Sequence, residues 1–441
     1  MKYHFIGIGG VGMSALARMC LERGDEVSGS DASMSYVTRA LEVAGIEISY
    51  DQRKENIREG QIVIYSTAIK EDNPEWIAAK ENKVLHRSEL LQELLDEKKA
   101  ILVVGAHGKT TTTTLLAHIC ETAGLCPSFV IGGFSPSLLG INGKWRKGDY
   151  FIAEGDESDG SFLRASPIGA IITNVDFDHL DYWKSEEALL GAYQKFIKGV
   201  KRRDLLFYWK EDRFLSTWDV DGVSFGLSEN AELRAKNVKF FEGKQFFDVD
   251  FQGVTYPNIE LNMLGRHNVL NALACFGMAI TLGASVENIR KALASFKGVK
   301  RRLEWRGNLR GAFIYDDYAH HPHEIESTLA AVNEAFQDRR KIAVFQPHRY
   351  SRMKDLIDEF VKNSVWKDSD ELIVTDIYSA GEAKIEGVSI EAFLERLEKK
   401  FTYVPRRELT AFLQGLVLEN DIVITLGAGD VTQVSSELVY G

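Results

Sequence analysis

The chain has 441 residues, of which 45% are hydrophobic and 27% charged, and this ordinary balance argues against extended disorder. At roughly 150 residues per domain, the length predicts about three domains. The net charge of −11 argues against nucleic acid as the main partner, because duplex-binding proteins usually carry a clustered basic excess. Small anionic ligands remain compatible with this charge, since helix N-termini bind them on acidic proteins as well.

The cysteines and the N-terminal segment indicate in which cellular compartment the protein is expected. The four cysteines stand at positions 20, 120, 126 and 275 without a CxxC pair, so neither a disulfide framework nor a zinc site is indicated. The start of the chain lacks the pattern of a signal peptide, and no run of about 18 apolar residues predicts a transmembrane helix. We therefore expect a cytoplasmic protein that does not contact a membrane.

Residues 1–98 are predicted to form a first domain in which short strands alternate with helices. This alternation favours a parallel sheet. The expected strands are 3–8, 26–30 and 61–66, the expected helix is 13–23, and a charged helix at 88–99 leads into the next domain.

A glycine-rich segment, Gly7-Ile8-Gly9-Gly10-Val11-Gly12, lies between the first strand and the first helix, and Asp31 follows the second strand. In a Rossmann unit such glycines let the backbone approach a diphosphate, and the acidic side chain accepts a hydrogen bond from a ribose hydroxyl. The spacing predicts a site for a dinucleotide or a nucleoside diphosphate. The alternative is a glycine turn needed only for packing of the helix on the sheet.

Residues 99–300 are predicted to form a second domain, with strands at 100–104, 150–153 and 170–173, a β-rich stretch at 205–251 and a helix at 268–282. The segment Gly105-Ala106-His107-Gly108-Lys109-Thr110-Thr111-Thr112 follows the first of these strands and precedes a helix expected at 112–123. Backbone amides of such a loop bind phosphates, the lysine reaches the terminal phosphates, and a threonine can hold Mg²⁺. The segment departs from the strict GxxxxGK pattern, because Val103 stands at the first glycine position.

Acidic residues follow two other strands of this domain. One set lies in Glu154-Gly155-Asp156-Glu157-Ser158-Asp159, and the other in Asp176-Phe177-Asp178-His179-Leu180-Asp181. Strand C-termini of α/β sheets face the ligand crevice, and Mg²⁺ prefers oxygen ligands. The pattern predicts a magnesium site, with Glu154 or Glu157 as a ligand and His179 either as a further ligand or as a residue that orders its loop.

Residues 301–441 are predicted to form a third domain. Its expected strands are 313–315, 341–345, 372–375 and 422–426, with a helix at 324–336. The alternation again favours an α/β fold, so that the whole chain is expected to be an α/β protein of three domains: Rossmann-like, P-loop ATPase-like and Rossmann-like.

Six separated motifs together resemble the ATP-dependent Mur ligases of peptidoglycan synthesis, and they occur in the family's order. They are residues 105–112, 153–159, 178–181, Gly265-Arg266-His267-Asn268-Val269-Leu270-Asn271-Ala272, Arg301-Arg302-Leu303-Glu304 and Asp316-Asp317-Tyr318-Ala319-His320-His321-Pro322. The departures are mild: Ala106 stands where the family often has threonine, and Gly155 and Gly160 stand where it often has alanine. They leave the phosphate chemistry intact.

The resemblance implies roles for individual residues. The UDP part of a UDP-linked substrate would be held by Gly9, Gly10, Gly12, Asp31, Ser66 and Thr67. ATP would be bound by Gly105, His107, Gly108, Lys109, Thr110, Thr111, Asn268, Asn271, Arg302 and Asp317, with the two asparagines at adenine, Arg302 at the γ-phosphate and Asp317 at the ribose. Mg²⁺ would be held by Thr110, Glu154 and His179. The alternative for Asn268 is helix capping, and Lys195 or Lys198 would be candidates for a carbamoylated lysine.

The third domain would bind the incoming amino acid. Tyr318, His348, Arg349 and Arg352 would line its site, with an arginine pairing with the amino acid's carboxylate. Lys109, His348 and Arg349 would be the catalytic residues, His348 as a base for the amine. A structural ion pair is the alternative for Arg352.

Within the family, residues 7–13, 345–352 and 378–382 resemble the members that ligate L-alanine to UDP-N-acetylmuramate with ATP through an acyl phosphate. Members that attach the tripeptide L-Ala-D-Glu-meso-diaminopimelate during recycling share the first half of the pattern and are the alternative. Three other classes fit less well. A nucleotide-dependent oxidoreductase leaves two domains unexplained, folylpolyglutamate synthase lacks the first domain, and a non-catalytic nucleotide-binding regulator does not need both Lys109 and Glu154.

Overall fold

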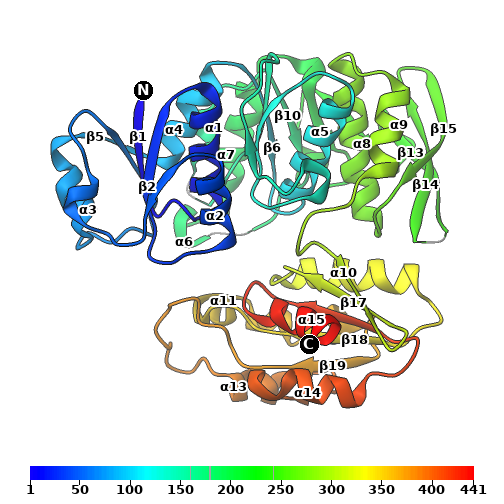
Figure 1. The fold of residues 1–441 in the computed structure, drawn as a ribbon. Coiled ribbons are helices and arrows are strands. Elements are labelled where there is room, and N and C mark those ends of the chain that lie inside the picture. Colours follow the sequence, from blue (N-terminus) through cyan, green and yellow to red (C-terminus); the bar gives the residue numbers. More distant parts are fainter. Residues whose placement is uncertain (159, 178–179, 242) are drawn as a thin grey trace. The chain divides into compact units, whose positions relative to one another are not determined.

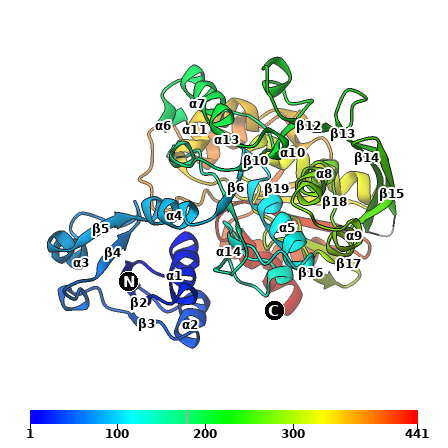
Figure 2. The same ribbon diagram turned by 90° about the horizontal axis from the view of Figure 1, so that it is seen from above.

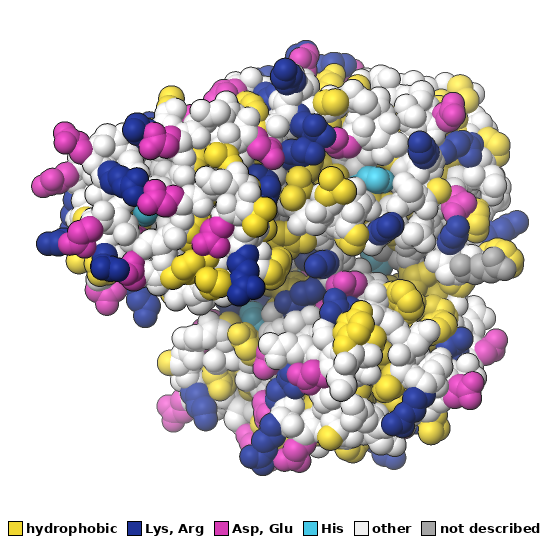
Figure 3. Space-filling model, in the orientation of Figure 1, with side chains coloured by type: hydrophobic (Ala, Val, Ile, Leu, Met, Phe, Trp, Pro, Cys, Tyr) yellow, Lys and Arg dark blue, Asp and Glu magenta, His cyan; other side chains and the backbone are white. Residues whose placement is uncertain are grey.

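The computed structural model describes residues 1–441 except 159, 178–179 and 242. The chain forms two compact units. Unit 1 comprises residues 1–238, 247–261 and 270–297, and unit 2 comprises residues 239–246, 262–269 and 298–441. Among the described residues, no helix is long and apolar enough to cross a membrane. On the face drawn in Figure 3, basic and acidic side chains are interspersed.

Unit 1 begins with a five-stranded parallel sheet in the order β3-β2-β1-β4-β5. The chain builds outward from β1 in one direction and then returns to its other side, so the switch point lies between β1 and β4. Ligands of open α/β sheets bind at such a point, beyond the strand C-termini. The strands are β1 (Lys2–Ile6), β2 (Glu26–Ser30), β3 (Glu47–Ser49), β4 (Ile62–Tyr65) and β5 (Lys83–His86), and the helices are α1 (Val11–Arg23), α2 (Tyr36–Val43), α3 (Pro74–Ala78) and α4 (Arg87–Asp96).

The second sheet of unit 1 has ten described strands in the order β15-β14-β13-β12-β11-β10-β6-β9-β7-β8. Its centre is β6, which pairs in parallel with β9 on one side and β10 on the other. Segments that follow these three strands therefore emerge at the same edge. The strands are β6 (Lys99–Val104), β7 (Ser128–Val130), β8 (Gly143–Lys144), β9 (Tyr150–Glu154), β10 (Gly169–Ile172), β11 (Leu206–Trp209), β12 (Val223–Gly226), β13 (Leu233–Phe241), β14 (Lys244–Phe251) and β15 (Val254–Leu261).

Helices pack against this sheet. They are α5 (Lys109–Thr122), α6 (Leu180–Trp183), α7 (Glu186–Gly199), α8 (Arg266–Thr281) and α9 (Val286–Ser295). Buried side chains of both sheets of unit 1 belong to one hydrophobic cluster, which includes Leu16, Leu90, Leu102 and Tyr193. Figure 2 shows α1 and α4 beside each other at the first sheet, where they are in contact.

A hairpin of the second sheet anchors the helix of the first. Asn142, directly before β8, is 3% exposed, and its amide donates to the carbonyl of Val11 (2.6 Å) and contacts Ser14 Oγ (3.2 Å). A Cβ at Gly143 would lie 2.6 Å from the carbonyl oxygen of Ala15, so only glycine permits this close approach. This hairpin thereby holds the start of α1 in place.

Unit 2 contains a six-stranded sheet in the order β16-β17-β21-β18-β19-β20, in which only the β16–β17 pairing among the described residues is antiparallel. The strands are β16 (Glu304–Leu309), β17 (Ala312–Asp317), β18 (Lys341–Phe345), β19 (Glu371–Val374), β20 (Thr402–Tyr403) and β21 (Ile422–Leu426). The helices are α10 (Pro322–Ala335), α11 (Tyr350–Phe360), α12 (Asn363–Trp366), α13 (Ile390–Arg396), α14 (Arg406–Leu416) and α15 (Val431–Tyr440). Strands β18 and β21 are wholly buried, as expected for the middle of a covered parallel sheet.

The three sheets confirm the expected three-domain α/β fold. Several predicted helix and strand bounds differ from the structure by one to three residues. The difference that matters most is that α5 begins at Lys109 rather than at residue 112. Gly108, with φ of 82°, makes the turn into the helix in a left-handed conformation that other residues rarely adopt. Lys109 and Thr110 consequently belong to the first turn of the helix, which fixes their direction relative to the sheet.

Candidate active site

The phosphate loop (Gly105–Thr112) joins β6 to α5, and its backbone has positive φ at Gly105 and Gly108. Gly105 has φ of 143°, and a Cβ there would lie 2.2 Å from Thr173 Oγ1. The loop is also held from β10: Thr173 Oγ1 donates to the carbonyl of His107 (2.7 Å), and the His107 amide donates to Asn174 Oδ1 (2.9 Å). The loop is therefore fixed before any ligand binds.

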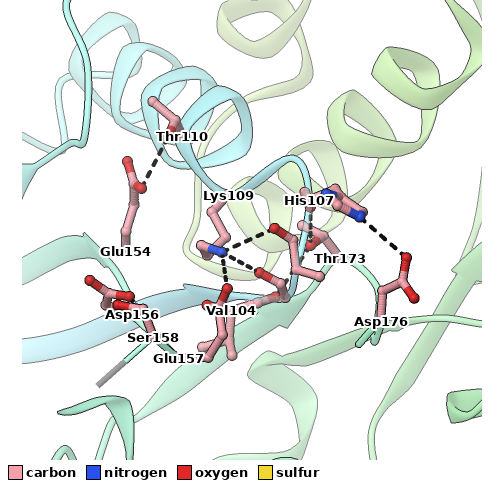
Figure 4. Close-up of polar contacts among 12 residues, drawn as sticks. Val104, His107, Lys109, Thr110, Glu154, Asp156, Glu157, Ser158, Thr173 and Asp176 are labelled. Carbon is pink, nitrogen blue, oxygen red and sulfur yellow. Dashed lines mark hydrogen bonds and ion pairs between the residues drawn. The ribbon is translucent and has the colours of Figure 1, made fainter. Parts of the chain in front are cut away.

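Lys109 lies in this loop with its ammonium group turned inward (Figure 4). Its Nζ donates to the carbonyls of Gly105 (2.6 Å) and Ala106 (3.2 Å) and to Glu157 Oε1 (2.7 Å). Burial disfavours the charged ammonium, but Glu157 and the nearby Asp156 and Glu154 carboxylates outweigh burial and raise the pKa of Lys109. The lysine is thus a fixed positive charge at the point where phosphates are expected.

Glu154 and Glu157 have different partners. Thr110 Oγ1 donates to Glu154 Oε2 (3.0 Å), and the Gly132 amide donates to Glu154 Oε1 (2.5 Å). Glu157, 2% exposed, binds Lys109 instead. A hydroxyl and a carboxylate oxygen side by side form a hard oxygen donor set that fits Mg²⁺, so Thr110 and Glu154 are the pair that would hold this ion. Glu154 is the last residue of β9 rather than the residue after it.

Two histidines were predicted to act near the phosphates, His179 as an Mg²⁺ ligand and His107 as an ATP-binding residue. His179 lies outside the described residues. His107, in the phosphate loop, has its Nε2 3.3 Å from Asp176 Oδ2 (Figure 4). Lys195 and Lys198, the candidates for carbamoylation, are exposed on α7.

The glycine loop (Gly7–Gly12) lies at the switch point of the first sheet. The amides of Gly7 and Ile8 both donate to the carbonyl of Ser30 (2.9 Å each), and Asp31 Oδ2 accepts from the Gly9 amide (2.8 Å). A Cβ at Gly9 would lie 2.8 Å from Asp31 Oδ2. Asp31 therefore shapes the loop, in addition to the ribose contact proposed for it.

The other predicted residues of this site emerge from neighbouring strands. Ser66 and Thr67 directly follow β4, and the Ser66 carbonyl accepts from the Ile69 amide (3.0 Å). Gly10 caps α1 in an extended conformation, and Gly12 is the second residue of that helix. The structure thus brings the predicted residues of the first domain to one edge of its sheet.

Asn268 and Asn271 are buried on α8. The Asn268 amide donates to the carbonyl of Leu264, just before the helix (2.7 Å). Asn271 lies beside the phosphate loop, because a Cβ at Gly108 would be 3.1 Å from its Oδ1. Of the two, Asn271 is the one that the structure places next to Gly108.

In unit 2, Asp317 at the end of β17 organises the turn that carries Arg302. Its two carboxylate oxygens accept from the amides of Leu303 (2.6 Å) and Ala319 (2.7 Å). Burial raises the pKa of Asp317 to about 7, although Arg302 opposes this shift. Arg302 contacts Glu324 (3.6 Å) and lies over the ring of Tyr318, 5.2 Å from its centroid.

His348, Arg349 and Arg352 form a compact group where β18 leads into α11. Arg352 donates to Nδ1 of His348 (3.2 Å), and the His348 ring stacks on Tyr378 at 5.7 Å. Burial, the neighbouring His320 and the two arginines lower the pKa of His348 to about 3, so this imidazole is neutral at pH 7. A group with so low a pKa is a weak base, and its observed contact is that of an acceptor for Arg352.

Arg349 has an unusual backbone. It caps α11 with φ of 66° and ψ of 139°, a conformation that costs a residue other than glycine about 1–3 kcal/mol, and its amide donates to the Tyr378 carbonyl (2.8 Å). Such strain often accompanies a functional site, because the surrounding structure holds the residue in place for a purpose other than stability.

Several residues at these sites were missed from the sequence. Glu157 as the partner of Lys109, Asn174 behind the phosphate loop, and Tyr378 under His348 are contacts between segments far apart in the chain, and the sequence carries no local signal for such pairings. Arg87 follows β5 directly, and its place at a strand C-terminus was a signal that could have been used.

Three family models match the chain in succession: "Mur ligase family, catalytic domain" over residues 2–99, "Mur ligase middle domain" over residues 103–279, and "Mur ligase, glutamate ligase domain" over residues 301–429. Together they cover most of its length. The chain belongs to the Mur ligase family, whose members are ATP-dependent amide-bond-forming ligases.

Relatives match over nearly the full length. A UDP-N-acetylmuramate–L-alanine ligase of Protochlamydia amoebophila is 43% identical over 99% of this chain and 97% of its own, and one of Aquifex aeolicus is 41% identical over the same shares. The crystal structure of a UDP-N-acetylmuramate–alanine ligase from Thermotoga maritima matches with a TM-score of 0.82 and 31% identity, covering 99% of this chain and 98% of that one. A murein peptide ligase from Psychrobacter arcticus matches with a TM-score of 0.71 and 23% identity over the same shares, a likeness of fold alone.

Proposed function

We propose that this chain joins L-alanine to the carboxylate of UDP-N-acetylmuramate with the use of ATP, a step of peptidoglycan precursor synthesis. The observation that carries the proposal is the phosphate loop, in which Lys109 and Thr110 stand on the first turn of α5 opposite the carboxylates of Glu157 and Glu154. Relatives with this activity are more than 40% identical over almost the whole chain, which favours this reaction over ligation of a tripeptide.

The three segments would divide the work. Residues 1–98 would bind the UDP substrate through Gly9, Gly10, Gly12, Asp31, Ser66 and Thr67. Residues 99–300 would bind ATP through Gly105, His107, Gly108, Lys109, Thr110, Thr111, Asn268 and Asn271. Residues 301–441 would contribute Arg302 and Asp317 to the nucleotide and Tyr318, His348, Arg349 and Arg352 to L-alanine.

In the first step, the substrate's carboxylate oxygen attacks the γ-phosphorus of ATP, and an acyl phosphate and ADP result. Two anions must approach each other, so positive charge at the site lowers the barrier. Lys109 would exchange its contacts with Gly105, Ala106 and Glu157 for phosphate oxygens. Thr110 and Glu154 would hold Mg²⁺, which supplies further neutralising charge when bound.

In the second step, the amine of L-alanine attacks the acyl carbon, and the tetrahedral intermediate expels phosphate. An arginine fork can hold the carboxylate of alanine in two charge-assisted hydrogen bonds. Arg352 and Arg349 would do this, and neutral His348 would orient Arg352 through its Nδ1. In this proposal His348 serves as a positioning residue rather than as the base.

Isotope transfer tests the proposed route. With ¹⁸O in the carboxylate of UDP-N-acetylmuramate, the acyl phosphate route moves one labelled oxygen into the released phosphate, while the other stays in the amide. Mass spectrometry of the phosphate would detect this label. Unlabelled phosphate together with a formed amide would contradict the acyl phosphate.

A further inference from the structure

Arg87 is the first residue of α4 and follows β5 directly, so it emerges at the same sheet edge as the glycine loop after β1 and the Ser66–Thr67 turn after β4. Helix α4 lies beside α1 (Figure 2). A Cβ at Gly12 would lie 3.2 Å from Arg87 Nη1 and 3.8 Å from its Cδ. The guanidinium group therefore lies directly over the glycine loop at the start of α1.

The guanidinium group of Arg87 adds to the partial positive charge at the N-terminus of α1. The N-terminus of a helix carries a partial positive charge, and the first turn of α1 contains no acidic residue. A guanidinium group beside that terminus is electrostatically unfavourable and would be stabilised by a further anion, since the carboxylate of Asp31 is already bound to the Gly9 amide. The described contact of the guanidinium with a carboxylate is to Asp156 Oδ2 at 3.4 Å, which is long for a charge-assisted hydrogen bond.

Asp156 comes from the acidic loop (Glu154–Ser158) after β9, between the residues that bind Thr110 and Lys109. Its Oδ1 already accepts from the Ser158 amide (3.0 Å). The side chains of Arg87 and Asp156 are 32% and 39% exposed, so solvent screens the pair and it adds little stability. A pair of this kind can be separated by a ligand at small cost.

We propose that Arg87 is a further binding residue for the diphosphate of the UDP substrate, and that Asp156 holds the guanidinium group until the diphosphate replaces it. This inference rests on the proposed function, because it takes the glycine loop as the UDP site. The planar fork of arginine matches a diphosphate, with which it forms shorter and stronger bonds than the observed one to Asp156.

Calorimetric titration with uridine, UMP and UDP tests the assignment. We expect Arg87→Gln to weaken UDP at least tenfold, equivalent to about 1.4 kcal/mol, and to change the affinity for uridine less than twofold. Arg87→Lys should fall between wild type and Arg87→Gln. A thermal melt of each variant verifies that it is folded.

Asp156→Asn is the matched control, because the asparagine oxygen can still accept from the Ser158 amide. If Asp156 competes with the ligand, this variant binds UDP as well as wild type or a few-fold more tightly. A loss equal to that of Arg87→Gln would show that the ion pair itself matters and would overturn the proposal.

Two further outcomes are distinguishable. If Arg87→Gln weakens uridine and UDP equally, Arg87 supports the fold of the site rather than binding the diphosphate. If Arg87→Gln leaves UDP binding unchanged, Arg87 does not bind the diphosphate. Either result overturns this inference and leaves the proposed function intact. Failure of the wild-type chain to bind UDP would instead contradict the proposed function.

Discussion

Unit 1 contains two loops of the same design, the glycine loop after β1 and the phosphate loop after β6, and they differ in what surrounds them. In the first, the Gly9 amide is bound by Asp31, and a cation beside the loop, Arg87, comes from the start of α4 after another strand. In the second, Lys109 belongs to the loop itself, and Glu154 and Glu157 face it. A strand–glycine–helix turn of this kind is suited to phosphate in both, but of the two loops only the second combines it with a lysine and with oxygen donors that fit a metal ion. The first is suited to binding, and the second to reaction.

The proposed difference between the two loops is tested most strongly by replacing Lys109. We expect Lys109→Met to lower kcat by roughly a thousandfold or more, because the charge that neutralises the phosphates is lost. Calorimetric binding of UDP-N-acetylmuramate should survive, since that ligand is assigned to the other loop. Loss of this binding in a folded variant would refute two separate sites.

The control for this variant concerns Glu157. Removing Lys109 leaves a buried carboxylate without its cation, which typically costs about 3–5 kcal/mol of unfolding free energy. The double variant Lys109→Met, Glu157→Gln removes that penalty. It should regain thermal stability and remain inactive. Recovered activity would show that Lys109 acts through folding.

Arg349 and Arg352 of unit 2 are assigned to the third ligand, L-alanine, and can be tested in the same way. We expect Arg352→Lys and Arg349→Lys each to raise the KM for L-alanine at least tenfold, about 1.4 kcal/mol, because lysine lacks the planar fork. The KM values for ATP and the UDP substrate should change far less. Steady-state kinetics with each substrate varied would check this. Unchanged KM values for alanine in both variants would make the pair structural.

Substitution of Asp31 is the counterpart of the Lys109 variant, because it should affect the UDP substrate and spare ATP. Asp31→Ala removes the acceptor for the Gly9 amide, and we expect the KM for the UDP substrate to rise about fivefold, as for loss of one hydrogen bond of about 1 kcal/mol. The KM for ATP should stay nearly constant. Asp31→Asn keeps an acceptor and should have a smaller effect. Equal rises in both constants would show that Asp31 shapes unit 1 as a whole.

The smallest expected effect is a pH profile that does not change. Because the pKa of His348 is lowered to about 3, the imidazole is neutral above that pH and should not titrate between pH 5 and 9. The pH dependence of kcat/KM for alanine in His348→Asn should therefore have the same shape as in wild type, at a lower level if Arg352 loses its orientation. An inflection near pH 6.5 that vanishes in the variant would identify His348 as an ordinary titrating base.

Much of the fold could be predicted because its signals are local. The strands at 26–30, 341–345 and 422–426 were predicted to the residue. The last two are short, mainly apolar runs, as buried parallel strands usually are. The predicted start of α5 was wrong. Five threonines follow Lys109, a residue type of low helix propensity, whereas the left-handed Gly108 begins the helix earlier.

The site was predictable to a lesser degree. Strand C-termini indicated Glu154 and the glycine loop, but the sequence left Glu154 and Glu157 as alternatives. In the structure Glu154 accepts from Thr110 and Glu157 pairs with Lys109, and these contacts form only when β9, the loop after it and α5 pack together. The pairing of Arg87 with Asp156 joins residues 69 positions apart, and only the packed structure brings them together.

The most direct test of the account is phosphate release from ATP by the wild-type chain, with UDP-N-acetylmuramate present and the amino-acid acceptor varied. L-Alanine, glycine, L-serine and the tripeptide L-Ala-D-Glu-meso-diaminopimelate form the panel. We expect release to require both ATP and UDP-N-acetylmuramate and to be fastest with L-alanine. Release with the tripeptide and none with L-alanine would contradict the proposed reaction and identify the chain as a recycling ligase.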